Sequence, residues 1–210
     1  MGSSEPKQFL LLNGKPVIWH TLSAFLSAFH DTEIILVLPE DRLSTGSEIT
    51  RAFESPNQIA IVGGGETRFH SVKKGLSLIR DPSIVFVHDG VRCMVTPELI
   101  KRCYNATVEK GNAVPVITAI DSLRVETKEG NKIIDRGNVK IVQTPQTFRS
   151  DILLGAFEQE YNLDFTDEAS VVERSGVKIN LVEGDESNFK ITRPLDLLVA
   201  EKIFEERQGK

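Results

Sequence analysis

Short apolar runs alternate with amphipathic stretches along this 210-residue chain, and no other feature constrains its fold as strongly. Apolar runs that are followed by stretches of helical period are typical of βαβ units. The pattern predicts one α/β domain over residues 1–210, built on a mostly parallel sheet that is flanked by helices. We expect strands over residues 33–38, 58–62, 84–87, 113–117, 139–143 and 178–182, and helices over residues 16–29, 67–79, 97–109, 150–160, 167–175 and 194–206.

One stretch interrupts this alternation. Residues 122–125 and 132–135 are both strand-like, and the turn sequence Lys128-Glu129-Gly130-Asn131 between them favours a β-hairpin. A hairpin inserted between two core strands cannot be buried on both faces, so we expect an arm that projects over about residues 119–138. The arm either packs against a second subunit or lies open in solvent as a flap. We favour the packing interpretation.

The composition argues against several classes of protein. The net charge of −5 is opposite in sign to the basic excess that a general nucleic-acid surface needs. No apolar stretch has the length of a membrane span, and we expect no signal peptide. The two cysteines, Cys93 and Cys103, are too few for a disulfide framework or a zinc site. We therefore expect a soluble, cytoplasmic protein with reduced thiols and with no nucleic-acid or membrane partner.

The segment His88-Asp89-Gly90-Val91-Arg92 directly follows the apolar run over residues 84–87. In open α/β sheets, ligands bind just outside the carboxyl ends of the strands, which is where Asp89 and Arg92 would lie. A carboxylate there suits a hydroxyl or a metal ion, and a guanidinium suits a phosphate. The alternative is that the two side chains pair only with each other across the turn, and these five residues alone do not decide between the two interpretations.

The other polar segments have ordinary explanations when each is considered singly. The glycines in Gly63-Gly64-Gly65-Glu66 let backbone N–H groups approach a ligand at a helix N-terminus, yet the same sequence suits a plain strand-to-helix turn. Lysines near a terminus are usually solvated, and a lysine in a strand-like segment such as residues 188–192 can extend to the surface. Thr166-Asp167-Glu168 is explained by helix capping. The four histidines do not cluster at the spacing of metal ligands.

Taken together, the segments resemble one known family. The motifs occur in the order Pro6-Lys7-Gln8-Phe9-Leu10, Gly64-Gly65-Glu66-Thr67-Arg68 with Ser71-Val72, His88-Asp89-Gly90-Val91-Arg92, Gln143-Thr144-Pro145-Gln146-Thr147-Phe148, Thr166-Asp167-Glu168-Ala169-Ser170, and Val182-Glu183-Gly184 with Asn188-Phe189-Lys190-Ile191-Thr192. This set covers essentially the whole chain. It resembles the 2-C-methyl-D-erythritol 4-phosphate cytidylyltransferases of non-mevalonate isoprenoid synthesis.

The resemblance implies a Rossmann-like nucleotidyltransferase fold and a homodimer joined by exchanged hairpin arms. It implies CTP and methylerythritol phosphate as substrates, with Mg²⁺ carried on CTP and no metal ligands from the protein. Three groups of residues receive roles from it. Gly64, Gly65, Glu66 and Ser71 would hold cytosine and ribose; Lys7, Lys190 and Arg136 would be catalytic; and Asp89, Arg92, Ser122 and Thr144 would bind the acceptor, with Arg136 and Ser122 reaching in from the partner's arm.

The implied reaction agrees with such residues. A phosphate monoester is already an anion at neutral pH, so its attack on the α-phosphorus of CTP needs neither a general base nor a covalent intermediate. The reaction needs two polyanions held in line and the growing negative charge neutralised. Lys7 and Lys190, together with Mg²⁺, are adequate for that task if the fold brings them together.

Two departures from the family pattern matter. Gly90-Val91 and Cys93 stand where the family usually has two alanines and a proline, and we expect only small changes in that loop and an inert Cys93. The family's first strand, its glycine-rich loop and a catalytic arginine all precede the position of Met1. We therefore expect the functional protein to carry roughly 20 further N-terminal residues. Two alternatives stay open: a ribitol-5-phosphate cytidylyltransferase, and an inactive nucleotide-binding or dimerisation module.

Overall fold

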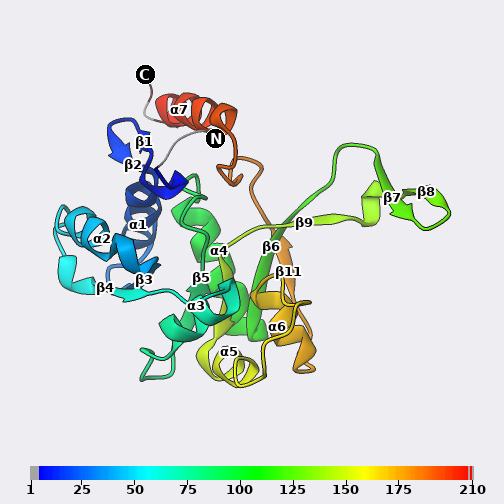
Figure 1. The fold of residues 1–210 in the computed structure, drawn as a ribbon, viewed down its shortest axis with the longest axis horizontal. Helices are drawn as coiled ribbons and strands as arrows, with labels where there is room; N and C mark the ends of the chain where they lie inside the picture. Colours follow the sequence, from blue (N-terminus) through cyan, green and yellow to red (C-terminus); the bar gives the residue numbers. More distant parts are fainter. Residues whose placement is uncertain (1–4, 208, 210) are drawn as a thin grey trace.

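A computed structural model describes residues 5–207 and residue 209 (Figure 1). The helices are α1 (Val17–Ala28), α2 (Leu43–Thr50), α3 (Arg68–Leu76), α4 (Pro97–Lys110), α5 (Ser150–Ala156), α6 (Glu168–Arg174) and α7 (Pro194–Arg207), with short 3-10 turns η1 (Lys7–Phe9), η2 (Glu40–Arg42), η3 (Pro56–Gln58) and η4 (Arg136–Asn138). The strands are β1 (Leu11–Leu12), β2 (Lys15–Pro16), β3 (Ile34–Leu38), β4 (Ile59–Gly63), β5 (Ile84–Val87), β6 (Asn112–Thr118), β7 (Leu123–Thr127), β8 (Gly130–Ile134), β9 (Lys140–Val142), β10 (Gln146–Arg149) and β11 (Leu181–Glu183).

The largest sheet is mixed and has the order β11-β6-β10-β5, with β9 also paired to β6. Strand β11 runs parallel to β6, whereas β10 runs antiparallel to both β5 and β6. Strands β9 and β10 pair antiparallel with opposite ends of β6. Residues 143–145, which connect β9 to β10, interrupt this pairing along β6. This interruption places Thr144 beside the carboxyl end of β5. The α/β character that the sequence predicts is confirmed.

Strands β3 and β4 form a separate parallel pair, and α2 and α3 contact them. A cavity of about 2030 Å³ lies between this pair and β5, lined by apolar residues of β3, β5 and α1 that include Leu36, Phe86 and Ile18. Its wall continues past Gly64 and Arg68 to Asp89. The cavity therefore connects the edges of two strands with the polar groups at their carboxyl ends.

The predicted arm is present. Strands β7 and β8 pair antiparallel from Leu123↔Ile134 to Thr127↔Gly130, and they project away from the body of the domain (Figure 1). The loop is Lys128-Glu129, and Gly130 after it has a φ of 129°, in the region that favours glycine. Large apolar side chains are exposed on and beside the arm, namely Ile120, Ile133 and Ile141.

Every predicted helix is present, but several predicted strand bounds are wrong. Strand β11 begins at Leu181 rather than at residue 178, because the Asn112 side chain takes the place of a backbone neighbour there: its Oδ1 accepts from the Asn180 N–H and its Nδ2 donates to the Lys178 carbonyl. Residues 188–192 are not a strand. Helix α2 and strand β10 were not predicted. No helix in the described part of the chain is long and apolar enough to cross a membrane.

Candidate active site

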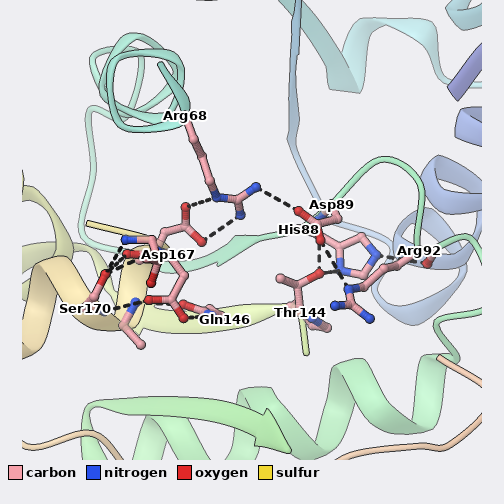
Figure 2. A network of polar contacts seen from close by, with 12 residues as sticks. Arg68, His88, Asp89, Arg92, Thr144, Gln146, Asp167 and Ser170 are labelled. Carbon is pink, nitrogen blue, oxygen red and sulfur yellow. Dashed lines mark hydrogen bonds and ion pairs between the residues drawn. The ribbon is translucent and has the colours of Figure 1, made fainter. Parts of the chain in front are cut away.

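Asp89 is the centre of a group of charged side chains at the carboxyl end of β5 (Figure 2). Its Oδ1 accepts a hydrogen bond from Arg68 Nη1 at 2.7 Å. Its Oδ2 accepts from Arg92 Nε at 3.2 Å and lies 3.2 Å from Lys190 Nζ. The pairing of Asp89 with Arg92 is thus real, but it is one part of a larger network. The interpretation that the two side chains pair only with each other is therefore wrong, and ligand binding by the segment 88–92 stays a prediction.

Arg68 extends this network to a second, deeply buried carboxylate. Its Nε and Nη2 donate to the two oxygens of Glu168, each at 2.9 Å, and the Glu168 side chain is only 2% exposed. Burial raises the pKa of Glu168, and the guanidinium opposes that rise. The bidentate hydrogen bonds from Arg68 favour the ionised form of Glu168, against the effect of its burial.

The network carries an excess of positive charge. Three cations face two carboxylates, which leaves one net positive charge for an anionic ligand. Burial alone would raise the pKa of Asp89, but Arg68, Lys190 and Arg92 overcome this effect and lower it to about 2. The Lys190 side chain is 47% exposed, so its ammonium group can reach a ligand as well as Asp89. The arrangement can hold a phosphate and at the same time offer a carboxylate to a hydroxyl.

Lys190 is directed to this place by its neighbours in the chain. Asn188 is fully buried; its Nδ2 donates to the Thr144 carbonyl at 2.8 Å, and its own carbonyl accepts from Arg92 Nη1 at 2.9 Å. The N–H of the buried Ile191 donates to the Val91 carbonyl. The loop that carries Lys190 is therefore fastened on both sides to the turn that carries Asp89.

His88 and Thr144 fix that turn from below (Figure 2). His88 Nε2 lies 3.1 Å from the Arg92 carbonyl, which can only accept, so the neutral ring carries its proton on Nε2. Nδ1 then accepts from the Thr144 hydroxyl at 3.0 Å, and that hydroxyl accepts the Asp89 N–H at 3.1 Å. The hydrogen bond of Thr144 is already donated, so Thr144 can accept from a substrate but cannot donate to it. His88 thus has a structural role, since its two ring nitrogens hold the Arg92 carbonyl and the Thr144 hydroxyl.

The protonation of His88 should govern stability in mild acid. Burial lowers the pKa of His88 to about 4 from its ordinary 6.5. As the pH falls from 6.5 towards 4, the unfolded chain binds a proton that the folded chain does not, so stability falls; below pH 4 both states are protonated and this loss ends. We expect a loss of about 3 kcal/mol across that window, measured by urea unfolding.

A His88→Gln variant should lack most of that loss, since glutamine does not titrate. His30→Gln is the matched control because His30 is exposed at the end of α1, and it should lose stability across the window as the wild type does. Equal pH dependence in wild type and His88→Gln would show that His88 is not the titrating group.

The glycine loop after β4 is held close to α3. The Gly65 N–H donates to Ser71 Oγ at 3.0 Å, and Lys74 Nζ donates to the Gly64 carbonyl at 2.7 Å. A Cβ at Gly65 would lie 2.5 Å from His70 Cβ, so only glycine lets the loop approach the helix this closely. Gly65 and Glu66 are exposed. The hydroxyl of Ser71, in α3, is already hydrogen-bonded to the backbone of Gly65 and Thr67. That these residues hold cytosine and ribose stays a prediction.

Three residues expected at the site make no contact with the Asp89 network. Lys7 lies in η1 and has no ion pair with another described residue, so its sharing a pocket with Lys190 stays a prediction. Arg136 and Ser122 belong to the exposed arm, where Arg136 Nη1 donates to the Ile120 carbonyl. Within one subunit the arm projects away from the body of the domain (Figure 1), and the action of Arg136 and Ser122 on a partner's site stays a prediction.

Arg68 and Glu168 were not predicted as site residues. Both lie in motifs that the sequence analysis singled out, but Glu168 was explained by the helix N-terminus and Arg68 received no role. The capping explanation itself is confirmed, since Asp167 and Ser170 form a capping box at the start of α6. An arginine and a glutamate 100 residues apart give no local signal of their pairing.

The family model described as 2-C-methyl-D-erythritol 4-phosphate cytidylyltransferase matches residues 1–206 of this chain. The chain belongs to this family. The enzyme of that name from Bacteroides fragilis is 45% identical over 204 residues, which are 97% of this chain and 93% of the relative. The resemblance identified from the motifs is thereby confirmed.

Solved structures agree with this assignment. The crystal structure of the 2-C-methyl-D-erythritol 4-phosphate cytidylyltransferase from Thermus thermophilus is 31% identical, has a TM-score of 0.75, and covers 97% of this chain and 96% of its own. The 4-diphosphocytidyl-2C-methyl-D-erythritol synthase from Anaerococcus prevotii reaches a TM-score of 0.84 at 25% identity, with 94% of this chain and 93% of its own covered. The Rossmann-like nucleotidyltransferase fold is confirmed.

Two of the three positions in the 88–93 loop that depart from the usual pattern of this cytidylyltransferase family, Gly90 and Cys93, have structural reasons. An alanine Cβ at Gly90 would lie 2.7 Å from Ile18 Cδ1, so the larger Ile18 fills the space that an alanine would take. Cys93 is buried in the apolar cluster with Leu12, Met94 and Ile191, and burial raises the pKa of its thiol to about 12. The thiol is therefore protonated at neutral pH, which supports the inert interpretation.

Proposed function

We propose that this protein transfers CMP from CTP to 2-C-methyl-D-erythritol 4-phosphate, giving 4-diphosphocytidyl-2-C-methyl-D-erythritol and pyrophosphate. Membership of the cytidylyltransferase family supports the reaction and makes the protein a nucleotidyltransferase of the non-mevalonate isoprenoid pathway. The observation that carries the proposal is the positively charged network around Asp89 beside the glycine loop. It is suited to a substrate that is both a phosphate and a polyol.

The reaction forms one phosphorus–oxygen bond and breaks another. A phosphate oxygen of the acceptor attacks the α-phosphorus of CTP, and the bond to the leaving pyrophosphate breaks. Lys190 would neutralise the charge that develops, since it is the most exposed cation of the network and, unlike Arg68, pairs with a single carboxylate. Asp89 already accepts three donors, which leaves one of its roughly four lone-pair positions for an acceptor hydroxyl. Arg92 would steer the acceptor phosphate, and Lys7 would contact the triphosphate of CTP.

Mg²⁺ would enter as part of the MgCTP substrate. Among the described residues, no group of three or more His, Cys, Asp or Glu side chains could hold a metal ion. Asp89, the carboxylate beyond the carboxyl end of β5, is already surrounded by three cations. The oxygens of the triphosphate are hard ligands of the kind Mg²⁺ prefers, and the ion needs no dedicated protein cage.

The acceptor assay tests this function. The purified protein is incubated with MgCTP and either methylerythritol phosphate or ribitol 5-phosphate, and pyrophosphate release is measured. We expect release with methylerythritol phosphate, at a kcat/KM well above that for ribitol 5-phosphate. Preference for ribitol 5-phosphate would assign the other acceptor, and no release with either would favour the inactive module.

The protein is also proposed to act as a homodimer through its arms. Ile120 is 75% and Ile133 71% exposed, an apolar surface that a second subunit would cover. Arg136 at the base of the arm is exposed and would supply a further cation to the partner's site.

Subunit mixing tests whether Arg136 acts on the partner. We expect Arg136→Ala and Lys190→Ala to be nearly inactive as separate homodimers, since each site then lacks one cation. In an equal mixture of subunits, about half of the dimers are mixed and each has one intact site, so about a quarter of the wild-type activity should return. Absence of any recovery in dimers shown by native mass spectrometry to be mixed would contradict the exchange of arms.

A further inference from the structure

Arg68 joins two parts of the site that belong to different segments of the chain. It is the first residue of α3, directly after the glycine loop of Gly64, Gly65 and Glu66. Its Nη1 donates to Asp89 at the end of β5, and its Nε and Nη2 donate to Glu168 at the start of α6. Figure 2 shows the guanidinium lying between the two carboxylates. Each nitrogen of this group therefore has a partner.

Glu168 is the fixed end of this connection. The N-terminus of α6 is held by its capping box and by Gln146 of β10, whose Nε2 donates to Asp167 Oδ2 at 2.8 Å and whose Oε1 accepts the Ala169 N–H at 2.7 Å. Strand β10 in turn pairs with β5, which ends at Val87, two residues before Asp89. Glu168 is thus anchored to the same sheet as Asp89, while Arg68 belongs to the helix that follows the glycine loop.

We propose that Glu168 is a positioning residue that sets the distance between the nucleotide loop and the acceptor pocket by holding Arg68 in place. The inference rests on the proposed function, in which CTP lies on the loop and the acceptor lies at Asp89. An in-line transfer depends on the alignment of its two substrates, and a displacement of about 1 Å can cost roughly 100-fold in rate. Glu168 itself is buried, so it would act through Arg68 and not by direct contact with a substrate.

The proposal predicts a change in kcat rather than in binding. In Glu168→Gln, the amide NH₂ group faces an N–H of Arg68, so one of the two hydrogen bonds is lost and the guanidinium is released. We expect kcat to fall by about 10- to 100-fold, with each KM within about threefold of wild type, because both substrates still find their own contacts. Glu168→Asp keeps the charge but withdraws it by one methylene, and we expect a smaller loss.

A double-mutant cycle with Arg68→Gln tests whether Glu168 acts through Arg68. We expect Glu168→Gln to reduce kcat little further when Arg68 is already replaced, since the connection is broken in both cases. Asp151→Asn, which breaks the exposed pair with Arg149, is the matched control and should leave kcat unchanged. Equal losses from Glu168→Gln in the two backgrounds would overturn the proposal, as would an unchanged kcat in folded Glu168→Gln.

Hydrogen exchange measures the same connection without turnover. In Glu168→Gln, we expect faster exchange at the amides of residues 64–71 and no comparable change in the arm. Where Glu168→Gln does not fold, Glu168→Asp carries both measurements. If the wild type failed to turn over either acceptor while the exchange result held, the proposed function would fail and the positioning by Glu168 would stand. Unchanged exchange over residues 64–71 would overturn the positioning role itself.

Discussion

Replacement of Lys190 by alanine is expected to lower kcat by about 10²- to 10³-fold, the loss seen when one preorganised donor to a developing charge is removed. Lys190 is the most exposed of the three cations around Asp89, and Arg68 is held by two carboxylates, so Lys190 is the one that can move from Asp89 to the transferring phosphate. Its removal also leaves the network with no net positive charge. The fold should persist because the anchors of this loop are Asn188 and Ile191.

Steady-state kinetics with both substrates, together with thermal unfolding, checks this expectation. Lys202→Ala is the control: Lys202 is also an exposed lysine in an ion pair, with Glu205 on α7, and its loss should leave kcat unchanged. Lys190→Arg keeps the charge in a different geometry and should retain more activity than alanine. A Lys190→Ala enzyme with wild-type kcat would remove this lysine from the mechanism.

The sequence predicts those strands and helices whose buried residues are apolar, because the apolar pattern can be read within one segment of the chain. Strand β5 was found because Ile84-Val85-Phe86-Val87 is apolar throughout, and its bounds agree with the structure. Strand β10 was missed because Gln146 and Thr147 are polar although fully buried. The amide of Gln146 is satisfied by Asp167 and Ala169, and these partners are supplied only by the tertiary fold.

The same distinction applies to the site. Asp89 and Arg92 follow a predicted strand, so the topology alone places them at the ligand-binding edge of the sheet. Lys190 was identified by family resemblance, since a lysine in a loop has no periodicity that reveals its direction. Arg68 and Glu168 meet because the tertiary fold brings the starts of α3 and α6 together. A residue that acts by positioning another residue has no characteristic sequence pattern. It can be identified only from the tertiary contacts of the folded chain.

Replacement of Asp89 by asparagine is expected to damage both the activity and the stability of the protein. Three cations lose their common counter-charge, and the site is left with three positive groups and only Glu168 opposite them. Breaking such a largely buried network typically costs about 3–5 kcal/mol of folding stability. Activity should fall by about 100-fold or more, because Arg68 and Arg92 then lose the group that orients them and the acceptor hydroxyl loses its carboxylate.

The pH dependence of unfolding distinguishes the loss of the Asp89 ion pairs from a general loss of packing. The folded pKa of Asp89 is about 2, below the ordinary 3.8, so its ionised form contributes stability that is fully present above pH 3.8 and is lost as the pH falls towards 2. That contribution is about 2 kcal/mol. Asp89→Asn should lack this acid-dependent part, whereas Asp41→Asn, at an exposed pair with Arg42, should keep it. An Asp89→Asn variant whose stability fell as steeply as wild type between pH 4 and 2 would show that the three cations do not hold this carboxylate ionised.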